Sequence, residues 1–123
     1  MLVIRANKLS EIQKDFNTIF PYLKLEFFRQ KNSIPAGNPK NTLVSGDYAL
    51  KPAKSGSDEE IQVDEDMKVA LLESLFLEKF GIAAQVLRKS GSTWLGIRMT
   101  DDWTLKRQND TGRELSNFTK FTG

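Results

Sequence analysis

Hydrophobic and polar residues alternate with two different periods along this chain, and the periods predict strands and helices in turn. A β-branched run at residues 2–5 and the two-residue alternation over 22–28 predict two strands, the second buried on one side. Between them, apolar residues recur at the three- and four-residue spacing of a helix: Ile12, Phe16, Ile19 and Phe20. Ser10 and Gln13 have the spacing of a capping box, so we expect this helix to begin at Ser10.

The strongest helical pattern in the chain lies at residues 66–81. Its apolar stripe is formed by Val69, Leu72, Phe76 and Phe80. We expect Asp64 or Asp66 to cap the start of this helix, and Gly81 to follow its last turn as glycines commonly do. A brief strand is expected just before it, at 61–63.

The C-terminal third predicts a hairpin followed by a helix. Residues 83–89 and 93–99 form two strand patterns around a turn centred on glycine. In the second strand, the alternation places Trp94, Gly96 and Arg98 on one face. The helix is expected over 104–116, with Thr104 or Asp102 as its N-cap.

This order of elements predicts an α+β two-layer sandwich, in which an antiparallel or mixed sheet carries helices on one face. A ferredoxin-like core with an added hairpin strand and a C-terminal helix fits the number of elements. We expect a single domain over 1–123. Within it, the segment around 29–60 is rich in Pro, Gly and Asn and is expected to be mobile at its flanks. A strand or two are expected in its middle, around Leu43, Val44, Tyr48 and Leu50.

Composition restricts the chemistry available to the protein. The chain has no Cys and no His, which excludes a cysteine nucleophile, a Ser-His-Asp triad, a histidine base and the usual zinc and copper sites. The acidic residues before the second helix do not have the spacing of a calcium loop: Asp58, Glu59, Glu60, Asp64, Glu65 and Asp66. We therefore expect no metal and no cofactor.

Charge and hydropathy point to no special partner or compartment. The net charge of +2, from 18 Lys and Arg against 16 Asp and Glu, does not call for a nucleic acid or a membrane. No signal peptide is visible and no apolar run is long enough to span a bilayer, so we expect a cytoplasmic protein with no membrane partner.

The densest chemistry lies in the stretch 93–116, TWLGIRMTDDWTLKRQNDTGRELS. Asp101, Asp102 and Trp103 could form a polar site at a helix N-terminus, where free N–H groups favour anions. The simpler interpretation is that the aspartates close the strand and cap the helix while Trp103 fills the layer below. We favour the simpler one, because two aspartates already supply negative charge there.

Two further groups of residues have a functional and a structural interpretation. Gln108, Asn109 and Gly112 share a helical face that could contact a ligand or peptide, since a glycine permits close approach, or could be a solvated rim. Basic and aromatic residues near the hairpin could bind single-stranded nucleic acid or could simply shield the sheet: Arg88, Lys89, Trp94, Arg98, Lys106 and Arg107. The small net charge argues against a dedicated nucleic-acid binder.

The run FGIAAQVLRKSGSTWLGIRMTDDWTLKRQNDTGRELS resembles a group of small uncharacterised bacterial proteins. Their C-terminal halves carry Q-V-x-R-K-S-G, then W-L, then T-D-x-W-T-L-x-x-Q-N-x-x-G, and FPYLKLEFF at 20–28 is similar to their N-terminal strand. The matching positions are Gln85, Arg88, Trp94, Thr100, Asp101, Trp103, Thr104, Gln108, Asn109 and Gly112. The group has no established activity, so the resemblance implies no catalytic or binding role.

We predict a protein that works by binding and not by catalysis, through the second hairpin strand, the TDDW corner and the last helix. The predicted contact residues are Arg88, Trp94, Arg98, Asp101, Trp103, Gln108 and Asn109. A protein partner or self-association is the leading hypothesis, because a hairpin near a sheet edge is a pairing surface. Single-stranded nucleic acid is the alternative partner. A second alternative is an enzyme that uses Asp101 or Asp102 with Lys106, which requires a carboxyl group in a pocket.

Overall fold

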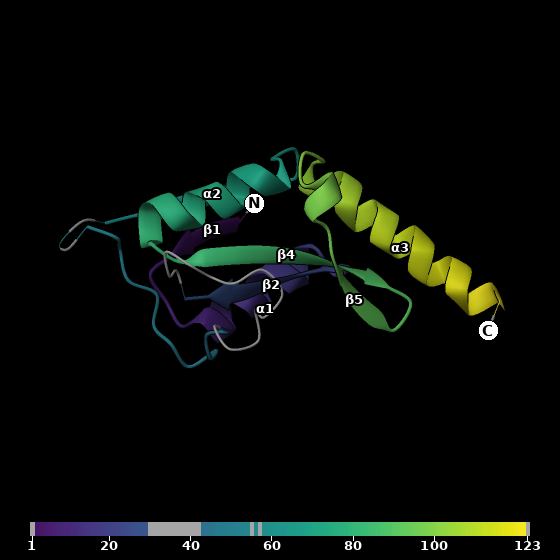
Figure 1. Cartoon of the computed structure of the whole chain (residues 1–123), viewed down its shortest axis with the longest axis horizontal. Coiled ribbons are helices and arrows are strands. Elements are labelled where there is room, and N and C mark those ends of the chain that lie inside the picture. Colours follow the sequence, from purple (N-terminus) through teal and green to yellow (C-terminus); the bar gives the residue numbers. More distant parts are fainter. Residues whose placement is uncertain (1, 30–42, 55, 57, 123) are drawn as a thin grey trace.

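In the computed structural model of this chain, the described residues form five antiparallel strands and three helices (Figure 1). It describes residues 2–29, 43–54, 56 and 58–122, with the side chains of all of these except Arg98 and residues 118–122. The elements are β1 (Leu2–Arg5), α1 (Leu9–Ile19), β2 (Leu23–Phe28), β3 (Glu60–Val63), α2 (Val69–Phe80), β4 (Ala83–Ser90), β5 (Thr93–Gly96), a 3-10 turn (Arg98–Thr100) and α3 (Leu105–Thr122).

The strands form two sheets. β1 pairs with β3, and β4 lies between β2 and β5 in the second sheet. This arrangement confirms the α+β class with helices packed on antiparallel sheets. It does not confirm the ferredoxin-like topology, because the recorded pairings divide the strands between two sheets and join β2 to β4.

One hydrophobic core joins the two sheets. α1 packs against β1 and β2, and α2 packs against β3 and β4, so each of these two helices contacts both sheets. At the centre, Phe27 of β2 meets Phe76 of α2 edge to face, with ring centroids 5.1 Å apart. The predicted apolar stripe of α2 is confirmed, because Val69, Leu72, Phe76 and Phe80 are all buried. Gly81 ends α2 in the left-handed conformation, with a φ of 63°.

The start of α1 differs from the prediction. Lys8 is the N-cap and makes no side-chain capping bond, so the capping box expected at Ser10 is wrong. The free N–H groups of the first turn instead donate to the backbone of a distant segment: Leu9 to the Tyr48 carbonyl at 2.9 Å and Ser10 to the Gly46 carbonyl at 3.0 Å. Such a cap is formed by tertiary contact and leaves no local sequence pattern.

The same segment replaces the strands expected around residues 43–50. Its described residues make isolated bridges, Phe28 with Leu43 and Lys8 with Ala49, and no strand of their own. The expected mobility of 29–60 falls partly on residues 30–42, 55 and 57, which lie outside the described part of the chain.

The outer edge of β2 is closed by hydrogen bonds to its carbonyl oxygens. The donors are Gln13 Nε2 to Leu25 at 2.9 Å, Asn17 Nδ2 to Leu23 at 2.8 Å and the Val44 N–H to Phe27 at 2.8 Å. Two amide side chains one turn apart on α1 thus occupy positions that a neighbouring strand would otherwise take.

The second hairpin strand is shorter than predicted. β5 ends at Gly96, and the chain then turns into the 3-10 turn because Ile97 leaves the extended conformation and is buried. The alternation expected through residue 99 is therefore wrong beyond Gly96. Leu95 and Met99 remain exposed, at 43% and 97% of their surface, although the alternation had grouped them with Ile97.

Candidate functional site

The N-termini of α2 and α3 cap each other through their backbones. The first N–H groups of each helix donate to carbonyl groups of the segment that precedes the other helix. These bonds run from Val69 to Trp103 at 3.0 Å, Ala70 to Asp101 at 2.8 Å, Leu105 to Met67 at 2.8 Å and Lys106 to Glu65 at 2.9 Å. The groups that could have held an anion at the TDDW corner are therefore already bonded, which supports the structural interpretation of this corner.

The side-chain caps of these two helices follow the prediction for one and not for the other. Thr104 Oγ1 accepts the Arg107 N–H at 3.1 Å, so the predicted N-cap of α3 is confirmed. The expected cap of α2 by Asp64 or Asp66 is wrong, because Lys68 is the N-cap and makes no side-chain bond. Asp64 Oδ1 instead accepts the Asp66 N–H at 2.8 Å and closes a local turn.

Gln108 lies at the centre of a polar joint beneath α3. Its side chain is fully buried. Its Oε1 accepts a hydrogen bond from Arg88 Nη1 at 2.9 Å, and its Nε2 donates to both the carbonyl oxygen and the Oγ1 of Thr100 at 2.7 Å. One amide thus joins α3, β4 and the 3-10 turn, so the interpretation of this residue as part of a solvated rim is wrong.

Asn109 and Gly112 continue this joint along the helix. Asn109 Oδ1 accepts the Tyr22 N–H at 2.9 Å. A Cβ on Gly112 would lie 2.9 Å from Tyr22 Cβ and 3.1 Å from Arg88 Cγ, so only a glycine permits this contact between helix and sheet. In the structure these residues position α3, and binding of a separate ligand by them stays a prediction.

The TDDW corner carries a stacked pair on its surface. The guanidinium carbon of Arg107 lies 3.7 Å from the centre of the half-buried Trp103 ring. Asp102 is exposed, and the ammonium of Lys106 lies 4.0 Å from the Asp110 carboxylate. Lys106 is thus near Asp110, and the carboxylate-enzyme alternative stays a prediction.

Trp94 shares its face of the sheet with Lys89, its partner in the ladder. The ammonium groups of Lys24 and Lys89 lie 5.2 and 5.9 Å from the centre of its ring. Arg88 does not join them, because it pairs with Leu95 in the ladder while Lys89 pairs with Trp94, and consecutive residues point to opposite faces. Arg88 and Trp94 of the predicted contact set therefore lie on opposite faces of the hairpin. The side chain of Arg98 lies outside the described residues.

Among the residues that the structure describes, no strand pairs with the outer edge of β5. The Lys89 N–H donates to the Tyr22 carbonyl at 2.9 Å, so the backbone N–H and C=O groups of Lys89 point to β2 and away from β5. Along an antiparallel strand, the backbone N–H and C=O groups of successive residues point alternately to one neighbouring strand and to the other. The backbone groups of Arg88 therefore point to β5, and those of its partner Leu95 point back to β4. Trp94 and Gly96 therefore direct their N–H and C=O groups outward.

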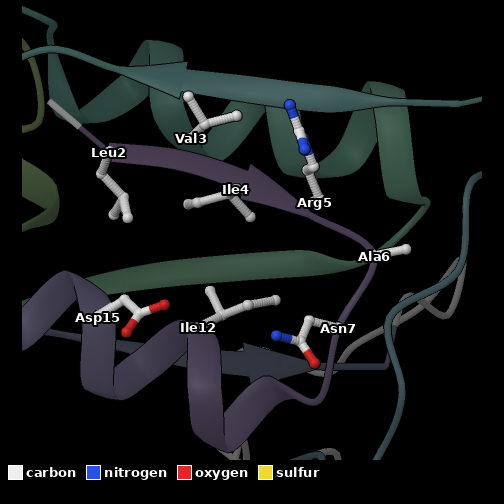
Figure 2. Close-up of a pocket in the computed structure, with 8 residues that line it drawn as sticks. All are labelled: Leu2, Val3, Ile4, Arg5, Ala6, Asn7, Ile12 and Asp15. Atoms are coloured by element: carbon white, nitrogen blue, oxygen red, sulfur yellow. The ribbon is translucent and has the colours of Figure 1, made fainter.

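Elsewhere, a hollow of about 370 Å³ runs along β1 (Figure 2). Figure 2 shows Leu2 and Ile4 on one side of the strand and Val3 and Arg5 on the other, with Asp15 and Asn7 near opposite ends of the hollow. Arg5 is already paired with Glu60 at 3.1 Å. Five of the eight lining residues are aliphatic, and the polar side chains of Asn7 and Asp15 lie too far apart along the hollow to converge on one ligand group.

Another hollow, of about 340 Å³, lies beside Trp94. It is lined by Gln13, Lys14, Asn17, Lys24, Leu25, Glu26 and Trp94. The amides of Gln13 and Asn17 are bonded to β2, so the groups that remain for a solute are the lysines, Glu26 and the indole.

No family model matches this chain, and neither a curated protein nor a solved structure matches it. The resemblance of the C-terminal pattern to small bacterial proteins stays a prediction. Within the described ranges, no three His, Cys, Asp or Glu side chains gather as they would around a metal ion. The helices in that part of the chain are also too short or too polar to cross a bilayer.

Proposed function

We propose that this protein binds other protein chains by strand addition at the outer edge of β5. The observation that carries the proposal is the contrast between the two edges of one sheet. The β2 edge is closed by Gln13, Asn17 and Val44, whereas β5 directs the backbone groups of Trp94 and Gly96 outward. An extended segment that pairs with β5 would satisfy these groups.

The side chains of β5 support the same function. Its four residues, Thr93–Gly96, carry no charge, whereas natural edge strands that avoid pairing often carry lysine or proline. Leu95 is 43% exposed on this strand, and the nearby Met99 is 97% exposed. A bound strand would cover part of this apolar surface.

The hairpin that carries β5 is fixed to the rest of the protein. Arg88 of β4 is bonded to Gln108, and the N–H of Tyr22 is bonded to Asn109, so α3 holds the end of the sheet. A rigid edge loses little conformational entropy when a strand adds to it, which favours binding. In this proposal Gln108 and Asn109 act by positioning the surface and not by contacting the partner.

The test compares two exposed leucines. Leu95→Lys places a charge on the β5 edge, and Leu71→Lys places the same charge on α2, where Leu71 is 49% exposed. Tagged wild-type protein and both variants are used to capture proteins from cells of the source organism. We expect captured proteins that bind to wild type and to Leu71→Lys but do not bind to Leu95→Lys. Equal retention by the two variants would show that β5 is not the binding edge.

A second candidate function is binding of single-stranded nucleic acid beside Trp94. The indole supplies one stacking surface, and three cations lie near it: Lys14 and Lys24 in the lining of the 340 Å³ hollow, and Lys89 at 5.9 Å from the ring centre. Titration of an oligonucleotide against Trp fluorescence tests it, with Trp94→Phe and Trp103→Phe as single-tryptophan variants. Binding should quench Trp94 and weaken steeply with salt. Absence of quenching at low salt would remove this candidate.

A further inference from the structure

We infer that β5 pairs with β5 of a second copy of this chain, about a two-fold axis that passes through Leu95. The inference rests on the proposed function and names the partner and the register. Its basis is that the outward backbone groups of β5 are complementary to themselves.

The outward groups belong to residues 94 and 96, which lie symmetrically about residue 95. When two such strands run antiparallel with Leu95 on the axis, Trp94 of one copy lies opposite Gly96 of the other. Each of these two pairs can exchange both N–H···O=C bonds, which gives about four hydrogen bonds in an antiparallel ladder. No outward backbone group of Trp94 or Gly96 is then left without a partner.

The side chains are compatible with this register. On the face that bears Trp94, the ring lines the hollow beside β2, with Lys24 Nζ 5.2 Å from its centre, and Gly96 has no side chain, so these two residues of β5 leave the edge uncovered. On the opposite face, the two copies of Leu95 meet in a pair without hydrogen bonds, where side chains approach most closely. An exposed leucine is covered as a result.

Charge does not oppose the pairing along the strand. The four residues of β5 are neutral, so no like charges meet across the axis.

The pairing is weak because it is short. Four residues from each chain bury far less than the roughly 1,600 Å² of a stable protein interface. We expect a dissociation constant on the order of 10 to 500 μM, so that the protein is monomeric when dilute and dimeric when concentrated. The experiment must therefore detect a transient dimer.

Cysteine trapping meets this need because the chain contains no cysteine. In the inferred register the two Leu95 Cα atoms lie about 4.5 Å apart, within the range that a disulfide spans. The control is Thr93→Cys, on the same strand and the same face. The two Thr93 positions would be separated by about 13 Å along the strands and could not join.

At equal protein concentration and mild oxidation, Leu95→Cys should form a covalent dimer at least ten times faster than Thr93→Cys. Sedimentation of wild type should show a mass that rises with concentration from 14.0 kDa toward twice that value, and Leu95→Lys should stay monomeric. Circular dichroism checks that each variant is folded.

Equal trapping rates for Leu95→Cys and Thr93→Cys would overturn the inferred register, and a wild-type mass that does not change with concentration would overturn the pairing itself. The proposed function survives those results if Leu95→Lys still loses captured partners that Leu71→Lys keeps. If the trapping contrast appears and no other partner is captured, self-association is the binding function.

Discussion

Arg88 and Gln108 share a hydrogen bond of 2.9 Å that joins β4 to α3 beneath the protein surface. Gln108 is fully buried, and the nitrogen of its side-chain amide donates to the Thr100 carbonyl oxygen. The bond thus ties together three segments of the C-terminal third, and the proposed binding edge depends on it for its position.

Substitution of Gln108 tests the strength of this joint. Gln108→Ala removes the acceptor of Arg88 and the donor to Thr100, and leaves a cavity. We expect a loss of about 2 to 4 kcal/mol in the free energy of unfolding, because hydrogen bonds to charged groups and buried packing are both lost. Urea denaturation measures it. Gln62→Ala on the exposed surface of β3 is the control and should change stability by less than about 0.5 kcal/mol. If Gln108→Ala and Gln62→Ala lost the same free energy of unfolding, the hydrogen bonds of Gln108 would not stabilise the protein.

Gly112 gives a prediction in which two effects oppose each other. Alanine is the better helix former by about 1 kcal/mol. In Gly112→Ala, however, the new Cβ would lie 2.9 Å from Tyr22 Cβ and 3.2 Å from the Lys89 carbonyl oxygen, so α3 must move away from the sheet. We expect the clash to prevail and the variant to lose about 1 to 2 kcal/mol in denaturant unfolding. Asn117→Ala, at an exposed position of the same helix, should be neutral or slightly stabilising. A stabilised Gly112→Ala would contradict the close contact.

Thr104 and Asp66 were both predicted to cap a helix, and only Thr104 does so. Thr104→Ala removes the oxygen that accepts the Arg107 N–H, and should cost about 1 kcal/mol of stability. Asp66→Ala should change stability by less than about 0.5 kcal/mol, because α2 is capped by the carbonyls of Trp103 and Asp101 and not by Asp66. Thermal unfolding of the two variants at one pH and salt concentration makes the comparison. A larger loss for Asp66→Ala would reverse the assignment of caps.

Periodicity predicted most of this fold because burial follows it directly. The alternate residues Leu23, Leu25 and Phe27 are buried on one face of β2, as the two-residue alternation required. The strand at 61–63 and the end of α2 at Gly81 were also readable, since strand and helix-end residues have local preferences. Prediction failed where partners lie far apart in sequence. The backbone caps of α1 by residues 46 and 48 leave no local pattern.

The candidate site was harder to predict for the same reason. The amides and the glycine of α3 were recognisable as unusual for a helix face, but their partners, Arg88 and Tyr22, lie 20 and 87 residues away. The same sequence could therefore describe a ligand surface or an internal joint. The open edge of β5 could not be separated from the closed edge of β2, because closure depends on how α1 is placed beside its sheet.

Removal of the closure at β2 provides the last prediction. In the double variant Gln13→Ala with Asn17→Ala, the carbonyl groups of Leu23 and Leu25 lose their donors, which should cost about 1 kcal/mol for each bond. The β2 edge is then open at Leu23 and Leu25, while Val44 still closes it at Phe27, and β5 is open as before. Because a chain with two pairing edges can join copies on both sides, we expect species larger than a dimer in sedimentation velocity at high concentration. Lys14→Ala, at an exposed position between the two amides, should leave the mass distribution of wild type unchanged. If the double variant is folded and sediments as wild type does, the amides of α1 do not control strand pairing at this edge.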